Sequence, residues 1–195
     1  IKPCDDQSLN TLHSEVLHLQ SVLQDLQSLA LLEAGDSSWQ VLTIDLLEIV
    51  QERVGRLQEQ EPRITWHMEL EHEQAYVEVE SRRLRQILDN ILQNALRYSP
   101  KPGKILLKLI RVGQNEGWIV SITDQGPGVE MHECERIFQR FYRSPGQSQT
   151  TGTGLGLPIA RALAESMGGN IQLTNPGTPG ACFALYLPAA ARRSA

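Results

Sequence analysis

The sequence has few cysteines and no long apolar run. Cys4, Cys134 and Cys182 are odd in number and widely spaced, so they fit neither a disulfide framework nor a zinc site. Such scattered thiols indicate a reducing compartment. No segment approaches the roughly 20 apolar residues that span a bilayer, and no signal-peptide pattern follows Ile1. We therefore expect a cytoplasmic location and no membrane contact by this chain, even if a parent protein is anchored in a membrane.

Positive charge is not in excess either. The formal net charge is −5 at pH 7, which argues against nucleic acid or an anionic membrane as the main partner. A polyphosphate ligand would need a locally basic pocket in this acidic protein. The 195 residues suffice for one sizeable core plus an appendage, or for two small domains. Because the chain begins with Ile rather than Met, we expect it to be part of a longer protein.

A leucine-rich segment at residues 8–33 is the first feature that is present. Its apolar residues follow the a and d spacing of heptads: Leu9, Leu12, Val16, Leu19, Leu23, Leu26 and Ala30. One helix cannot bury its own stripe, so one interpretation is a dimerising hairpin or bundle. The other is an amphipathic helix that lies on the following domain. Gly35 is a plausible end of this helix.

The remainder, about residues 39–188, alternates strand-like and helical patterns. The strand-like runs are Gln40–Ile44, Ile64–Leu70, Ala75–Val79, Lys104–Val112, Gly117–Thr123, Ile171–Thr174 and Cys182–Leu187. The helical patterns are Asp45–Gln60, Leu84–Ser99, Glu130–Arg140 and Leu155–Met167, with Asp45 and Ser81 as the expected N-caps. This order predicts an α+β fold, namely a two-layer α/β sandwich in which helices cover one face of a mixed sheet.

The helix at 84–99 has an apolar stripe and a polar face with possible chemistry. Asn90, Asn94 and Arg97 follow one another at four-residue and three-residue spacing, so they project to one side. Two carboxamides and a cation suit an oxygen-ligated metal and the anion that accompanies it. The alternative is an ordinary core helix with a polar outer face, and this segment alone does not separate the two.

The segment Asp124-Gln125-Gly126-Pro127-Gly128 ends a strand-like run. Its glycines allow close approach of a ligand to the backbone, and its carboxylate can accept a hydrogen bond from an exocyclic amine such as that of adenine. A turn that closes a hairpin is the alternative interpretation.

A second glycine-rich segment, Gly152 to Leu157, opens the last expected helix. Its alternating glycines let successive N–H groups and the helix dipole contact phosphate. No Gly-Lys-Ser/Thr follows, so it is not a P-loop, and it lacks the third glycine of the dinucleotide fingerprint. The alternative is a flexible linker into a helix.

Between these segments, two aromatic residues and two arginines precede a tract that cannot build a core. The tract, residues 144–151, is rich in Ser, Pro, Gly, Gln and Thr. We expect a mobile lid hinged on Phe138 and Phe141, with Arg140 or Arg143 able to reach phosphate oxygens. Core packing is the main role expected for the two phenylalanines.

The four segments together are far more specific than any one of them. In order, Asn90-x3-Asn94, Asp124-x-Gly126-x-Gly128, Phe138-x2-Phe141 and Gly152-x-Gly154-x-Gly156 resemble the N, G1, F and G2 boxes of sensor histidine kinases. The resemblance implies the Bergerat-type sandwich shared with gyrase-like ATPases. Residues 39–190 look like the ATP-binding catalytic domain of such a kinase, and residues 1–35 like the second helix of its dimerisation and phosphoacceptor hairpin.

The resemblance implies ATP and Mg²⁺ as ligands. Asn94 would ligate the Mg²⁺ that bridges the ATP phosphates, Asn90 would support that shell, and Arg97 would replace the usual phosphate-contacting lysine. Asp124 would accept from the adenine amine. The other implied ATP-binding residues are Tyr98, Gly126 and Gly128 at the adenine end, and Arg140, Arg143, Gly152, Thr153, Gly154, Leu155, Gly156 and Leu157 at the phosphates and the base of the lid.

The resemblance also implies partners. They are the receiver domain of a response regulator and, in the full-length parent, a second copy of the protein, with no nucleic acid. No His-Glu/Asp-Leu-Arg-x-Pro box occurs in the sequence, so the phosphoacceptor histidine is expected outside this chain. His13 and His18 are poor substitutes for it.

Asn90 separates the candidate functions. ATPases of this superfamily usually carry glutamate at the matching place, where it activates water, and an amide cannot accept that proton. The sequence therefore favours a kinase that positions the γ-phosphoryl group for another acceptor. The alternatives are a gyrase-like or chaperone-like ATPase and a nucleotide-free interaction module. Two positions depart from the family pattern: Arg97, and Pro158 in the first turn of its helix.

Overall fold

The computed structural model describes residues 16, 19–20, 22–30, 40–70, 74–113, 116–144 and 152–190. The chain divides into two compact units, Ile1–Ser37 and Ser38–Ala195. In the first unit, residues 22–30 are helical and Val16, Leu19, Leu23 and Leu26 are exposed. The rest of the leucine-rich segment at 8–33 lies outside the described residues, so its dimerising role stays a prediction.

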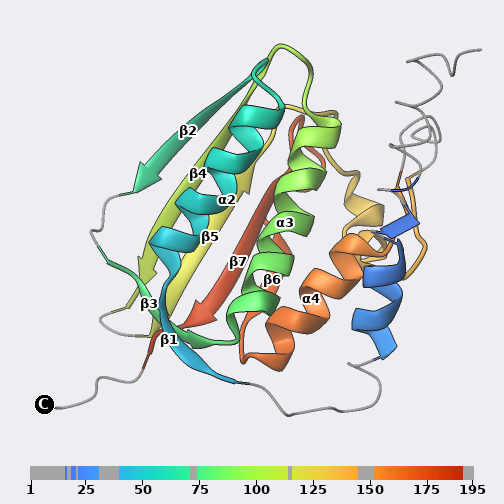
Figure 1. Ribbon diagram of the computed structural model, residues 1–195. Helices are drawn as coiled ribbons and strands as arrows, with labels where there is room; N and C mark the ends of the chain where they lie inside the picture. Colours follow the sequence, from blue (N-terminus) through green and yellow to red (C-terminus); the bar gives the residue numbers. More distant parts are fainter. Residues whose placement is uncertain are drawn as a thin grey trace, which may run out of the picture. The chain divides into compact units, whose positions relative to one another are not determined.

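The second unit is organised around a five-stranded mixed sheet (Figure 1). Its strands lie in the order β2-β4-β5-β7-β6, with β2 parallel to β4 and the other pairs antiparallel. The strands are β2 (Ile64–Leu70), β4 (Gly103–Val112), β5 (Gly117–Thr123), β6 (Asn170–Leu173) and β7 (Cys182–Pro188). A separate antiparallel pair, β1 (Leu42–Asp45) and β3 (Tyr76–Val79), is joined to the chain after β7 by a bridge between Val77 and Ala189.

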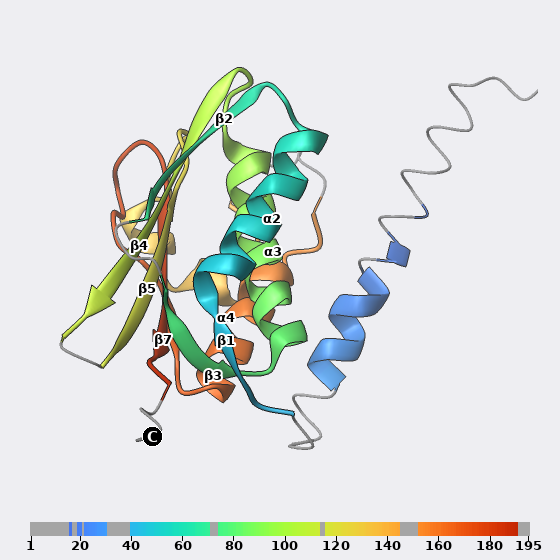
Figure 2. The same ribbon diagram turned by 60° about the vertical axis from the view of Figure 1, so that its left-hand side comes forward.

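Three helices cover one face of this sheet (Figure 2). They are α2 (Leu46–Gln60), α3 (Ser81–Tyr98) and α4 (Gly156–Ser166). The core lies between the two layers. It contains Leu84, Ile87, Leu88, Ile91 and Leu92 of α3, all at most 1% exposed, against inward residues of the sheet such as Ile105, Leu107, Ile122, Phe183 and Leu185. The predicted two-layer α/β sandwich is therefore confirmed.

Local sequence explains these elements. In β4, residues from Lys104 to Leu109 alternate between more accessible and buried positions, which is the period of a strand with one covered face. In α3 the apolar residues recur with helical period on the buried side. Asp45 caps α2 as predicted, because its side chain accepts a hydrogen bond from the Leu47 N–H at 3.0 Å.

Two local predictions were wrong. The N-cap of α3 is Glu80 rather than Ser81, because the longer carboxylate accepts from the N–H groups of Arg82 and Arg83. The helix expected at 130–140 consists instead of two short 3₁₀ turns, η1 (Met131–Glu133) and η2 (Arg136–Phe138).

None of the helices in the described part of the chain has the length and apolar character that a bilayer crossing requires.

Candidate functional site

Asp124 is a buried carboxylate directly after β5, and only one of its two oxygens accepts hydrogen bonds from described residues. Oδ1 accepts hydrogen bonds from the N–H groups of Gly126, at 2.8 Å, and Ala181, at 3.1 Å. Oδ2 is buried and has no hydrogen-bond partner among the described residues. Burial raises the pKa of Asp124, and the two backbone hydrogen bonds oppose that rise. The site therefore holds a fixed acceptor that has no donor among the described residues and is available to a ligand.

The turn before β7 shapes this carboxylate, and the sequence analysis missed it. Ala181 donates to Asp124, and a Cβ atom at Gly180, where φ is +76°, would lie 2.5 Å from the Asp124 carbonyl oxygen. Asn175 holds the turn closed by donating to the Gly180 carbonyl at 3.0 Å and accepting from the Cys182 N–H at 2.6 Å. The run Asn-Pro-Gly-Thr-Pro-Gly at 175–180 was the available signal, since these residue types favour turns.

Gly126 and Gly128 allow close backbone contacts beside the carboxylate. A Cβ atom at Gly126 would lie 2.8 Å from the carbonyl oxygen of Tyr98, at the end of α3. At Gly128, φ is +81° and a Cβ atom would lie 1.9 Å from the carbonyl oxygen of Thr178. Only glycine fits such a place. The half-buried Tyr98 therefore lies next to the predicted adenine end, and its role in lining that end stays a prediction.

Asn90 lies on α3 opposite the start of α4. It is half-buried, and its Nδ2 is buried without a partner among the described residues. A Cβ atom at Gly156, the first residue of α4, would lie 3.5 Å from the Asn90 Oδ1. Asn94, also half-buried, follows one turn later on α3. The structure thus brings the first and last predicted segments together.

Arg97 places a cation beside the second glycine segment. Its side chain belongs to the last turn of α3 and is exposed, and a Cβ atom at Gly152 would lie 2.5 Å from its Nη1. Guanidinium groups suit phosphate oxygens because they offer several N–H donors in one plane. Arg97 and Gly152, 55 positions apart in the printed sequence, are therefore neighbours at the predicted phosphate end.

The glycine segment leads into α4 through a tight turn. The Thr153 hydroxyl accepts from the Leu155 N–H at 3.2 Å, and Gly154 has φ of +71°. Leu155 is 1% exposed, so its side chain packs in the core, and Leu157 is half-buried in the first turn of the helix. Pro158 is accommodated in that same first turn, as expected.

The segment from Phe138 to Arg143 borders this turn. The Phe141 N–H donates to the Gly154 carbonyl at 3.0 Å, while Phe141 itself is exposed and adopts a left-handed φ of +63°. Phe138 packs edge-on against the core residue Phe183, with ring centroids 6.4 Å apart. The core role expected for the phenylalanines thus holds for Phe138 and is wrong for Phe141. Arg140 and Arg143, both exposed, flank Phe141 and Tyr142.

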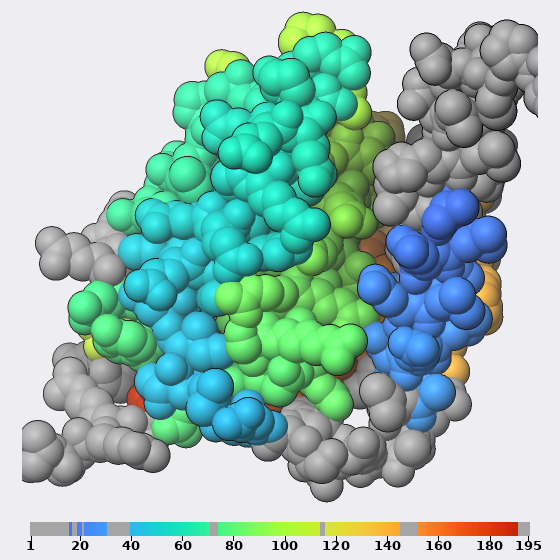
Figure 3. Space-filling view, viewed as in Figure 1, coloured from blue at the N-terminus to red at the C-terminus, as the bar shows by residue number. Residues whose placement is uncertain are grey.

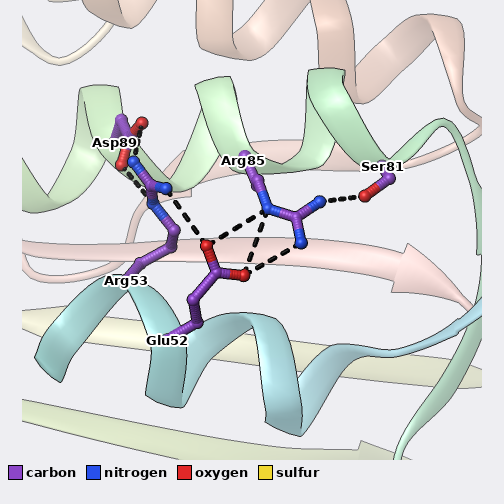
Figure 4. Close-up of polar contacts among 5 residues, drawn as sticks. All are labelled: Glu52, Arg53, Ser81, Arg85 and Asp89. Carbon is purple, nitrogen blue, oxygen red and sulfur yellow. Dashed lines mark hydrogen bonds and ion pairs between the residues drawn. The ribbon is translucent and has the colours of Figure 1, made fainter. Parts of the chain in front are cut away.

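The opposite side of α3 is joined to α2 by charged groups (Figure 4). Arg53 binds Asp89 through two hydrogen bonds, of 2.7 and 2.5 Å, and Arg85 binds Glu52 at 2.9 Å. Arg85 also donates to Ser81. The hydrogen bonds from Arg85 lower the pKa of Glu52, with a smaller effect of Arg53. The side chains of α2 and α3 meet over this face of the domain (Figure 3).

The fold and this site define a class of nucleotide-binding domain. A family model described as histidine kinase-, DNA gyrase B- and HSP90-like ATPase matches residues 79–191, more than half of the chain. The chain belongs to this family, which implies that it binds ATP. Within the family it is the ATP-binding catalytic domain of a sensor histidine kinase, as the relatives show.

The adaptive-response sensory kinase SasA of Synechococcus sp. (strain CC9311) is 34% identical to this chain over 166 residues, which are 81% of this chain and 43% of SasA. The solved structure of the Acinetobacter baumannii histidine kinase AdeS has a TM-score of 0.76 and 25% identity, covering 98% of this chain and 88% of that one. Full-length ShkA, crystallised in complex with AMPPNP, has a TM-score of 0.77 and 26% identity, covering 95% of this chain and 40% of that one.

The chain spans half or less of the length of the first curated relatives that it matches, between 24% and 50%. The relatives therefore contain segments for which this chain has no counterpart.

Proposed function

We propose that this domain binds Mg²⁺·ATP and positions the γ-phosphoryl group for transfer to a histidine outside the present chain. The observation that carries the proposal is the buried Oδ2 of Asp124, which has no partner in the part of the chain that the structure describes. Such an acceptor fits the exocyclic amine of adenine. The AMPPNP bound to the structural relative ShkA supports the same class of ligand. In the parent protein we propose a homodimer that serves the receiver domain of a response regulator.

At the other end of the site, Arg97, Arg140 and Arg143 would bind phosphate oxygens, and the N–H groups from Gly152 to Leu157 would close over them. Asn94 fits Mg²⁺ by its chemistry, since an amide oxygen is a hard ligand and the remaining ligands can be phosphate oxygens and water. The described residues contain no cluster of three or more His, Cys, Asp or Glu side chains that could hold a metal alone. Mg²⁺, when bound, would neutralise charge on the phosphates.

Asn90 supports kinase activity over ATPase activity. Its amide cannot take a proton from water, so the site would hold ATP without rapid hydrolysis. The gyrase-like and chaperone-like ATPases of the family remain the second candidate, and a nucleotide-free module the third. The buried polar atoms of Asn90 and Asp124 that lack partners among the residues described weigh against the third.

The experiment compares ATP binding and ATP hydrolysis in the wild type and in two matched variants, Asn90→Glu and Asn90→Gln. Calorimetry should show ATP binding by the wild type, and chelation of Mg²⁺ should weaken ATP binding while leaving adenosine binding unchanged. Asn90→Glu installs a proton acceptor and should raise hydrolysis, whereas Asn90→Gln should not. Rapid hydrolysis by the wild type would contradict the kinase proposal, and absence of any nucleotide binding would favour the interaction module.

A further inference from the structure

Glu133 is a buried carboxylate that the nucleotide site, as described above, does not use. It lies in η1, and only 5% of its surface is exposed. Its Oε1 accepts from the Tyr142 hydroxyl at 2.5 Å, and its Oε2 accepts from the Ser144 hydroxyl at 2.9 Å. Both oxygens are therefore engaged by hydroxyl groups of one short downstream segment.

That segment, residues 140–144, has no regular secondary structure to hold it. It is fixed on one side by the Phe141 N–H, which donates to the Gly154 carbonyl. On the other side the Arg136 guanidinium lies 4.6 Å from the ring centroid of Tyr142, and Glu133 holds the hydroxyl of the same ring. The Tyr142 N–H also donates to the Gln139 carbonyl at 3.2 Å. These contacts hold the segment in place of a ladder of backbone hydrogen bonds.

The protonation states of Glu133 and Tyr142 favour the hydrogen bond between them. The hydrogen bond from Tyr142, followed by that from Ser144, lowers the pKa of Glu133, and the same bond raises the pKa of Tyr142. A neutral hydroxyl thus donates to a charged carboxylate, which is the stronger kind of hydrogen bond. An exposed carboxylate would repel a triphosphate, whereas this one is buried with both oxygens engaged. Its chemistry therefore fits a support better than a direct ligand contact.

We propose that Glu133 is a positioning residue of the nucleotide site, which holds Tyr142 and Ser144 and thereby fixes the segment that carries Arg140 and Arg143. The inference rests on the proposed Mg²⁺·ATP site, because it assigns those two arginines to the phosphates. Glu133 then acts on phosphate affinity and leaves the adenine end unchanged, since Asp124 follows β5 and is held by the turn before β7 rather than by residues 140–144.

The test is a series of ligands measured against matched variants. The dissociation constants of adenosine and of a non-hydrolysable ATP analogue with Mg²⁺ are measured by competition for the wild type, Glu133→Gln, Tyr142→Phe and the control Glu135→Gln. Glu135 lies in the same stretch, but its side chain is 81% exposed and pairs with Arg161. Glu133→Gln should weaken the ATP analogue about fivefold to tenfold and change adenosine by less than twofold. Glu135→Gln should change neither.

Tyr142→Phe keeps the ring against Arg136 and removes only the hydroxyl. It therefore tests the same hydrogen bond if Glu133→Gln folds poorly. Its effect should not add to that of Glu133→Gln in the double variant, because both break one interaction. Equal weakening of adenosine and the ATP analogue, or no weakening of either, would overturn the positioning role. Failure of the wild type to bind any nucleotide overturns the ATP site itself, and the positioning role with it.

Discussion

The two sides of α3 differ in whether their polar side chains have hydrogen-bond partners. Toward α2, polar side chains find partners: Arg53 binds Asp89, and Arg85 binds Glu52. Toward the ends of β5 and α4, the Nδ2 of Asn90 and the Oδ2 of Asp124 are buried without partners among the described residues. A buried polar atom without a partner costs free energy that a paired one does not. We therefore regard the paired side as the support and the unpaired side as the site.

The comparison is tested most severely by adding a methyl group on each side. Gly128→Ala places a Cβ atom 1.9 Å from the Thr178 carbonyl oxygen at a φ of +81°, and should cost about 2–5 kcal/mol of unfolding free energy. Gly55→Ala, in the exposed middle of α2, meets no described atom within 4 Å and should add about 0.5–1 kcal/mol. Urea unfolding measures both, and similar effects of the two substitutions would contradict the contrast.

Asp124→Asn should separate affinity from stability. The amide donates where adenine also donates, so the affinity for ATP should fall by about 10-fold to 100-fold, as for loss of a hydrogen bond to a charged group. Without nucleotide, the unfolding free energy should stay the same or rise, because the buried charge is removed. Calorimetry and urea unfolding provide the two numbers. A loss of stability similar to that of Gly128→Ala would mean that Asp124 is structural.

The pH dependence of stability reports on the same carboxylate. Burial raises the pKa of folded Asp124 above its ordinary value of 3.8, so the folded state binds this proton more tightly than the unfolded state. Its contribution to stability is therefore most favourable at low pH and is lost as pH rises through the raised pKa. The stability advantage of Asp124→Asn should shrink as pH falls from about 7 toward 4. An advantage that is constant with pH would show that Asp124 ionises normally.

On the paired side, Asp89→Asn should reduce stability without changing the site. Arg53 is 11% exposed and would keep only part of its bidentate partner, so the cost should be about 1–2 kcal/mol. Glu52→Gln is the control, since that carboxylate is 47% exposed and such surface pairs contribute within about 1 kcal/mol. The ATP affinity of the folded protein should change less than twofold in both. A large loss of affinity in Asp89→Asn would show that the paired side tunes Asn90.

The smallest effect is expected from Gly152→Ala. Its Cβ atom would meet the flexible end of the Arg97 side chain at 2.5 Å rather than backbone, so Arg97 can move aside at little cost. Stability should change by less than about 0.5 kcal/mol, and ATP affinity should fall about twofold to threefold because the displaced cation leaves the phosphate end. Combining Gly152→Ala with Arg97→Ala should add nothing further. Additive losses of affinity would show that the two residues act independently.

Much of this protein was predictable because local patterns agree with the final fold. The apolar period of α3, the Asp45 cap and the alternation in β4 all act within a few residues of one another. The prediction of Ser81 as the N-cap failed locally, because the neighbouring Glu80 caps α3 instead. The other two wrong predictions depend on contacts from elsewhere in the chain. The 130–140 segment has a helical composition, yet it forms two 3₁₀ turns. In this arrangement Glu133 accepts hydrogen bonds from Tyr142 and Ser144. Phe141 looks like a core residue, yet its N–H is held by Gly154 and its ring is exposed.

The sequence by itself determined which residue types are available to a nucleotide: an acceptor at Asp124, amides on one helix face, and glycines where backbone must come close. Periodicity and residue chemistry are local properties, and they can be read along the chain. Only the tertiary structure decided that the Ala181 N–H donates to one oxygen of Asp124, that the other oxygen has no partner within the described ranges, and that Gly152 lies beside Arg97. Those relations join residues more than 50 positions apart, and packing of helices on a sheet sets them.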